Sequence, residues 1–217
     1  HTIKAVIFDL DGVIIDSEPV YLGMLYDYLT ENGVPVQRGQ LDFAVGGSSK
    51  DVYAKVEMFC QGKLTTADMR NYLLENAKTI GEGYREMLNS NAVALMEYLK
   101  ENSFRIALAS SSNMHTINTV LGVCGLRGYF EAVVSGEIFR ESKPNPEIYI
   151  HTLELLGLRS EDCLVVEDSA YGIEAAVNAG IRVIAKKDHR FGIDQSKADY
   201  YIDDLLEIKG VLEALNK

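Results

Sequence analysis

Short apolar runs alternate with longer amphipathic stretches along most of this chain. Runs of a length suited to strands occur at residues 3–8, 104–109, 132–135, 163–166 and 181–185, with a weaker one at 200–202. Between them, residues 91–102, 113–123, 144–156 and 169–179 carry apolar side chains three and four positions apart, as helices do. This alternation predicts an α/β fold with right-handed crossovers and a doubly wound, Rossmann-like parallel sheet.

Residues 17–85 break this rhythm. They contain no convincing strand pattern and instead predict amphipathic helices at 19–31, 50–60 and 66–88. We therefore expect a small helical insert at 17–85, and a core built from residues 1–16 and 86–217.

The composition narrows the class of protein. The chain has 217 residues, 47% of them hydrophobic, and a formal charge of −11, which argues against a nucleic acid or an anionic membrane as partner. Its apolar runs fall far short of the roughly 20 residues of a spanning helix, and no secretion signal is recognisable, so a cytoplasmic location is expected. Three widely separated cysteines without a CxxC pair predict neither a disulfide framework nor a zinc site. The sequence carries no signal for an oligomeric state.

The first candidate site residues are Asp9 and Asp11, which follow the apolar run at 3–8. In an extended segment, residues two apart face the same side, so both carboxylates can enter one site. One could attack phosphorus and form an aspartyl phosphate, while the other donates a proton to the leaving oxygen and later activates water. Taken alone, the pair also fits a solvated acidic turn.

Two further groups follow the next predicted strands. A cluster of Ser110, Ser111, Ser112 and Asn113 stands where a strand meets a helix, so hydroxyl and backbone N–H groups there could hold a phosphoryl group. Lys143 precedes Pro144 and could offset phosphate charge. A simple helix cap and an exposed lysine are the alternatives.

Adjacent carboxylates follow the strand predicted at 163–166. Glu167 and Asp168 offer the hard oxygen ligands that Mg²⁺ prefers, although Asp168 could equally cap the next helix. Open α/β sheets bind ligands at the carboxyl ends of their strands, so the coincidence of all these groups at strand ends favours one shared site.

In this order, Asp9-Leu-Asp11-Gly12-Val13, Ser110, Lys143-Pro144 and Glu167-Asp168-Ser169 resemble the haloacid dehalogenase-like superfamily. The helical insert resembles the cap of its phosphatase and β-phosphoglucomutase branch. The resemblance implies Mg²⁺ as cofactor, Asp9 as the nucleophile and Asp11 as the general acid/base. It also implies that Ser110 and Lys143 hold the phosphate. Asp168 is implied as a metal ligand, together with Asp9 and the Asp11 backbone carbonyl. Glu167 is implied as a direct or outer metal partner.

The resemblance also places a specificity loop on the cap. Gly47, Ser48, Ser49 and Lys50 would lie in this loop and offer donors to a polar substrate. The same residues are equally compatible with a plain loop that caps the next helix.

The substrate class is a small phosphorylated metabolite, with sugar phosphates expected. β-Phosphoglucomutases usually carry an Asp-Thr-Ala segment, a nearby His and a cap-loop Arg. This chain has Asp16-Ser17-Glu18-Pro19, no His nearby and Ser49 where the Arg would fall, which favours a phosphatase. A phosphoglucomutase-like isomerase and a non-enzymatic module that holds an aspartyl phosphate remain as alternatives.

Overall fold

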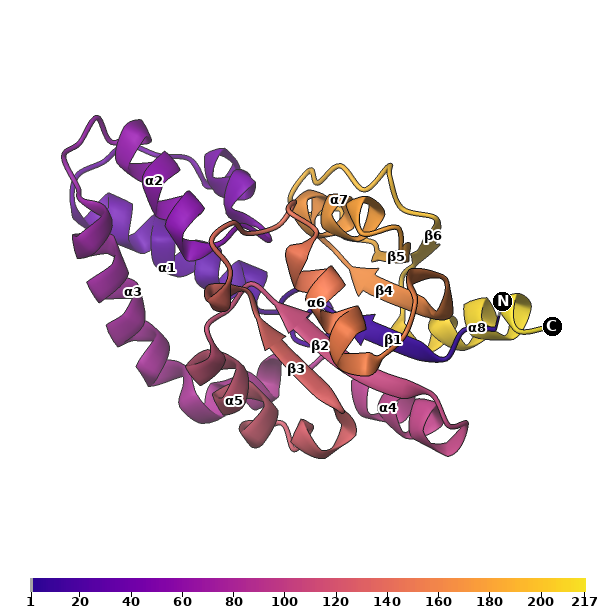
Figure 1. Ribbon diagram of the computed structural model, residues 1–217. Helices are drawn as coiled ribbons and strands as arrows, with labels where there is room; N and C mark the ends of the chain where they lie inside the picture. The colour runs from indigo at the N-terminus through magenta and orange to yellow at the C-terminus, as the bar shows by residue number, and fades with distance from the viewer. Residues whose placement is uncertain (1) are drawn as a thin grey trace.

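A six-stranded parallel sheet forms the centre of the molecule (Figure 1). The computed structural model describes residues 2–217, apart from the side chain of Ser49. The strands are β1 (Ala5–Phe8), β2 (Arg105–Ser110), β3 (Ala132–Ser135), β4 (Cys163–Glu167), β5 (Arg182–Lys186) and β6 (Tyr200–Ile202). Their order is β3-β2-β1-β4-β5-β6, with every pairing parallel. The chain adds β2 and β3 on one side of β1 and β4 to β6 on the other, so the direction of winding reverses beside β1.

Helices bury both faces of this sheet. Val6 and Phe8 point into one apolar core, while Ala5 and Ile7 point into the other, as the two-residue period of a strand requires. The first core is closed by α4 (Ala92–Glu101), α5 (Met114–Val123) and α8 (Ile208–Leu215), and the second by α6 (Glu147–Leu156) and α7 (Ala170–Asn178). The predicted doubly wound α/β core is confirmed.

The inserted segment is helical, as predicted. It contains α1 (Glu18–Glu31), α2 (Ser49–Phe59) and α3 (Thr66–Ile80), which lie beside the core (Figure 1) and share an apolar cluster that includes Leu29, Val56 and Met69. None of the described helices combines the length and apolar character needed to cross a membrane.

One helix boundary differs from the sequence prediction, and one helix was not predicted. The third insert helix was expected to run to residue 88 but ends at Ile80, because Gly81 adopts a positive φ of 44°. The chain continues as a 3₁₀ helix over Gly81–Met87, which buries Tyr84 against the core. The sequence analysis also predicted no helix at α8, although Ile208, Val211, Leu212 and Leu215 have helical spacing.

Two crossing segments connect the insert to the core, and they are hydrogen-bonded to each other. The Asp16 N–H donates to the Met87 carbonyl at 2.7 Å. The Asn89 side chain donates to the Val13 carbonyl, also at 2.7 Å. This pairing fixes the chain just after β1, where the candidate site begins.

Candidate active site

The carboxyl ends of the three central strands bring the predicted groups together. Asp9 directly follows β1, Ser110 ends β2 and Glu167 ends β4, with Asp168 next along the chain. Phe8 pairs with Leu108 on one side and Val166 on the other, so these strand ends lie at the same level. This is the edge where a doubly wound sheet binds its ligands.

Lys143 reaches this edge from the loop before α6. Its ammonium lies 2.6 Å from Glu167 Oε1, 3.3 Å from Asp9 Oδ1 and 3.1 Å from the Ala109 carbonyl, and its side chain is 2% exposed. Burial opposes the ammonium form, but Asp9 and Glu167 outweigh it and raise the pKa of Lys143. Lys143 is therefore a buried, permanent cation at the site. The Tyr149 hydroxyl also donates to Glu167, so that carboxylate is already engaged.

Asp168 has no such partners. Both of its carboxylate oxygens are buried without a hydrogen bond, which is costly unless something else satisfies them. Carboxylate oxygens of Asp9, Glu167 and Asp168 lie within 4.8 Å of one another. Burial first, then nearby carboxylates, raise the pKa values of Asp9 and Asp168. A hard divalent cation fits this donor set and would satisfy the free oxygens.

The turn after β1 leaves room for this cluster. Gly12 adopts a φ of 82°, and a Cβ atom there would lie 1.9 Å from Asp168 Oδ2. Only glycine combines the backbone conformation with the free space that Asp168 occupies.

Asp11 lies in a different environment from the metal-type cluster. The Ser17 hydroxyl donates to its Oδ1 at 2.5 Å, and the Ser112 hydroxyl donates to its Oδ2 at 2.8 Å. Burial raises the pKa of Asp11, and these two hydrogen bonds act in the opposite direction. Ser17 occupies the N-cap position of α1 but makes no cap bond, because its hydroxyl is turned to Asp11. Asp11 is thus oriented on both oxygens.

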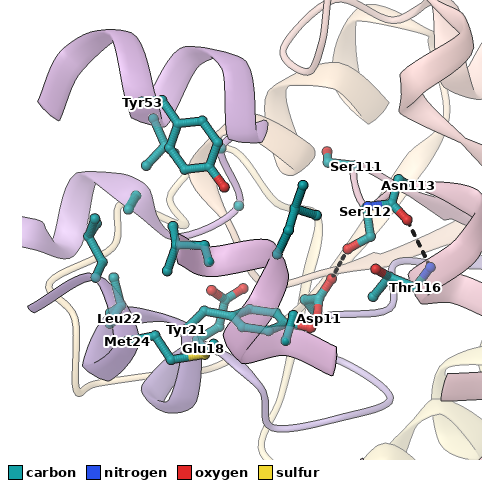
Figure 2. Close-up of a pocket in the computed structure, with 18 of the residues that line it drawn as sticks. Asp11, Glu18, Tyr21, Leu22, Met24, Tyr53, Ser111, Ser112, Asn113 and Thr116 are labelled. Carbon is teal, nitrogen blue, oxygen red and sulfur yellow. Dashed lines mark hydrogen bonds between the residues drawn. The ribbon is translucent and has the colours of Figure 1, made fainter. Parts of the chain in front are cut away.

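A cavity of about 190 Å³ opens between this edge and the insert helices. Asp9, Asp11 and Ser111 line its core end. Figure 2 shows Glu18 and Tyr21 of α1 close to Asp11, with Tyr53 of α2 across the pocket. The volume is below the roughly 300–1,000 Å³ of pockets for drug-sized ligands, so a small metabolite fits.

Asn113 and Ser110, two of the predicted binding residues, make local hydrogen bonds within the core. Asn113 lines the cavity, but its side-chain oxygen accepts the Thr116 N–H and so caps α5. Ser110 is buried at the end of β2, where its hydroxyl accepts the Ser112 N–H at 3.1 Å.

The predicted cap loop touches the core. Gly47 lines the cavity, and Ser48 caps α2 by accepting the Asp51 N–H. Lys50 is exposed and is not among the residues that line the cavity, and the side chain of Ser49 lies outside the described part of the chain. Gly46 has a φ of 74°, and a Cβ atom there would lie 2.2 Å from the Ser169 hydroxyl. The loop therefore packs directly on the start of α7.

A family model described as haloacid dehalogenase-like hydrolase matches residues 6–186. The chain belongs to this family. Among curated haloacid dehalogenase-like relatives, hexitol phosphatase B of Escherichia coli is 32% identical over 95% of this chain and 94% of its own length. The phosphorylated carbohydrates phosphatase of Thermotoga maritima is 30% identical over 83% of each chain.

Solved structures of the family show the same fold. The β-phosphoglucomutase of Clostridium difficile superposes with a TM-score of 0.80 over 98% of each chain, at 23% identity. Together with the family match, the phosphatase relatives identify this haloacid dehalogenase-like chain as a phosphoric monoester hydrolase.

Some site residues carry no clear sequence signal. Ser17 and Ser112 orient Asp11, and Tyr149 holds Glu167, yet a serine before a helix usually indicates a cap and a tyrosine within an apolar stripe indicates core. Ser112 belongs to the serine cluster that the sequence predicts as a phosphoryl holder, but its contact with Asp11 was not predicted. Nothing in the sequence pattern points to Tyr149.

Proposed function

We propose that this protein is a Mg²⁺-dependent phosphatase of small phosphorylated metabolites, sugar phosphates above all, that acts through an aspartyl phosphate on Asp9. One observation carries the proposal: the unpartnered Asp168 carboxylate lies beside Asp9, at a cavity that also contains Asp11. A metal site, a nucleophile and a second carboxyl group thus share one small enclosure.

In this mechanism, Asp9 attacks the phosphorus atom and Asp11 protonates the leaving oxygen. The raised pKa of Asp11 supports the acid role, because a carboxyl group that keeps its proton nearer neutral pH is the better donor. Asp11, deprotonated by the first step, then takes a proton from the water that hydrolyses the aspartyl phosphate. The hydrogen bonds from Ser17 and Ser112 hold it in place for both steps.

Asp168 and Asp9 would bind the metal directly, with the Asp11 carbonyl as the third protein ligand. Glu167 is already engaged by Lys143 and Tyr149, which favours an orienting role for it next to the metal. When bound, Mg²⁺ neutralises negative charge on the phosphoryl oxygens and eases the approach of a carboxylate.

Ser110, Ser111 and Lys143 would hold the phosphoryl group. Lys143 is a buried cation beside Asp9, and Ser111 lines the cavity that Asp9 also lines. The start of α5 adds backbone N–H groups at the same end of the sheet.

Residues 17–85 would act as a cap over the site, with residues 1–16 and 86–217 as the catalytic core. The direct packing of Gly46 on Ser169 supports a cap that closes on the core. Gly47 would contact the substrate, and Ser48, Ser49, Lys50 and Asn113 stay predictions as rim residues.

A phosphate-release screen over phosphorylated metabolites tests the proposal. We expect release that needs Mg²⁺, is abolished by chelation and is lost in the Asp9→Asn variant. Release that persists without divalent metal, or in Asp9→Asn, would contradict the proposed mechanism. Lack of release from every metabolite and from a general aryl phosphate would instead favour a non-enzymatic phospho-receiver.

A phosphoglucomutase-like activity is the second candidate, because solved β-phosphoglucomutases share this fold. Incubation with β-glucose 1-phosphate, Mg²⁺ and a trace of bisphosphate, followed by phosphorus NMR, separates the two. We expect free phosphate, whereas glucose 6-phosphate would identify a mutase.

A further inference from the structure

Glu18 is a buried carboxylate that the proposed chemistry does not use. It lies in the first turn of α1 and is only 5% exposed, and its Oε1 atom has no hydrogen-bond partner. An unpaired buried carboxylate is expensive, so its retention suggests a partner that arrives from outside. Glu18 lines the same cavity as Asp11, and Figure 2 shows the two side chains near each other.

The electrostatic surroundings of Glu18 are strongly negative. Burial, then Asp11 and Asp9, raise the pKa of Glu18, so its ionised form is costly until a hydrogen-bond donor of the substrate offsets the charge. Among the described residues that line the cavity, none is Lys, Arg or His. Lys143, the nearby buried cation, is engaged by Asp9 and Glu167 at the phosphoryl end.

The walls that the insert contributes to the cavity offer little else for a polar substrate. The insert contributes Leu22, Leu25, Val52 and Leu73 to its walls. The hydroxyl groups of Tyr21 and Tyr84 lie 3.0 Å apart and are hydrogen-bonded to each other. Among the described insert residues that line the cavity, Glu18 is therefore the one that offers a carboxylate to a leaving group.

We propose that Glu18 determines substrate specificity by accepting a hydrogen bond from a hydroxyl or ammonium group of the leaving group and by repelling leaving groups that carry a carboxylate or second phosphate. This inference rests on the proposed phosphatase function and sharpens its substrate class. A donor supplies the partner that Oε1 lacks, whereas an anion brings a second buried negative charge with no cation to pair it. The curated relatives include both a hexitol phosphatase and a phosphoglycolate phosphatase, so Glu18 places this chain with substrates of the first chemistry.

Four phosphate esters of similar size test this selectivity in the wild-type enzyme with Mg²⁺. Glycerol 3-phosphate carries hydroxyl donors, O-phosphoethanolamine an ammonium, 2-phosphoglycolate a carboxylate, and ethyl phosphate none of these. We expect the kcat/KM value for the better donor ester to exceed the value for 2-phosphoglycolate by about 100-fold or more. Discrimination of this size is within the range that one or two unpaired buried polar groups produce. The faster of the two donor esters identifies the donor as hydroxyl or ammonium.

Variants then assign the effect to Glu18. Glu18→Gln removes the charge and should reduce the preference for the donor ester over 2-phosphoglycolate by about tenfold or more, whereas Glu18→Asp keeps the charge and should retain discrimination against the carboxylate. Glu75→Gln makes the same charge change on the exposed surface of α3 and should leave the preference unchanged. Thermal melting checks that each variant is folded.

Three results would overturn the inference: 2-phosphoglycolate as the best substrate, ethyl phosphate matching the donor esters, or an unchanged preference in a folded Glu18→Gln. If Glu18→Gln does not fold, the wild-type ratios and Glu18→Asp still decide. If the enzyme releases phosphate from an aryl ester but lacks this selectivity, only the inference about Glu18 is contradicted. If the protein releases no phosphate from any ester, the proposed phosphatase function itself is contradicted.

Discussion

Buried carboxylates outnumber buried cations at the strand edge. Asp9, Glu167 and Asp168 are buried there, with Glu18 of α1 buried in the same site, and among the described residues Lys143 is the buried cation, paired with Asp9 and Glu167. Such an arrangement opposes folding unless a metal and a substrate complete it, because each unpaired charge loses its hydration. At the scale of single residues, the same buried carboxylates therefore lower the stability of the folded chain and supply its binding and catalytic groups.

Replacing Lys143 by Met tests this balance. The change leaves Asp9 and Glu167 without their cation, so we expect the free energy of unfolding of the metal-free protein to fall by about 3–5 kcal/mol, together with loss of phosphate release. Urea denaturation measures the loss, with the exposed Lys63→Met as control. An effect no larger than that of the control would show that the pairing contributes nothing.

Ser112→Ala tests the orientation of Asp11. Loss of the Ser112 hydrogen bond removes an interaction that lowers the pKa of Asp11, so that pKa should rise. We expect kcat to fall by about tenfold, which corresponds to about 1.4 kcal/mol in the barrier. In a pH–rate profile, the transition that reports the ionisation of Asp11 should move to higher pH. Ser112→Thr keeps the hydroxyl and should restore both kcat and the position of this transition. An unchanged profile in Ser112→Ala would separate Ser112 from Asp11 function.

The sequence predicts site residues well where their position is set by the end of a strand. Asp9, Ser110 and Asp168 each follow an apolar run, and parallel strands bring such positions to one edge. Glu18 and Ser17 lie at the start of a helix, where acidic and hydroxyl residues are ordinary caps. Only the folded chain shows that Ser17 turns to Asp11 and that Glu18 enters the cavity.

At the scale of elements, periodicity located the strands and the principal helices to within a few residues. It overextended α3, because the apolar spacing continues past Ile80 although Gly81 takes a positive φ. Two contacts between the insert or its connections and the core had no sequence signal. The hydrogen bond from Asn89 to the Val13 carbonyl and the packing of the loop before α2 on α7 are of this kind.

Gly46→Ala tests that packing. A Cβ atom there would overlap Ser169, and alanine is strained at a φ of 74°, so the loop should no longer close on the core. We expect kcat/KM for a sugar phosphate to drop by about tenfold or more, since misplaced closing loops weaken catalysis strongly. Gly39→Ala, in the 3₁₀ helix over Arg38–Ala44 and with open space around it, should be close to wild type. Equal activities of the two variants would argue against a closing role for this loop.

At the scale of the whole molecule, stability should depend on pH and on metal together. The pKa values of Asp9, Glu18 and Asp168 are raised by folding above their unfolded values near 4, so the folded state binds more protons. This contribution is present below about pH 4 and is lost as the pH rises through the folded pKa values.

We therefore expect the metal-free protein to lose stability as the pH rises above about 4, the unfolded value of these groups, and Mg²⁺ to reverse part of that loss. Asp168→Asn should flatten the pH dependence and weaken the effect of Mg²⁺. Thermal melts with chelator or Mg²⁺ across this range measure both. Parallel curves for wild type and Asp168→Asn would mean that Asp168 does not titrate in this way.

The most direct test of the account is to trap the phosphorylated enzyme. The wild-type protein is mixed with a phosphate-labelled substrate and Mg²⁺, quenched in acid within a turnover, digested and sequenced by mass spectrometry. We predict one phosphoryl group on the peptide that contains Asp9, removable by hydroxylamine as an acyl phosphate is, and no label in Asp9→Asn. Label on another residue, or phosphate release by an Asp9→Asn enzyme, would contradict Asp9 as the nucleophile.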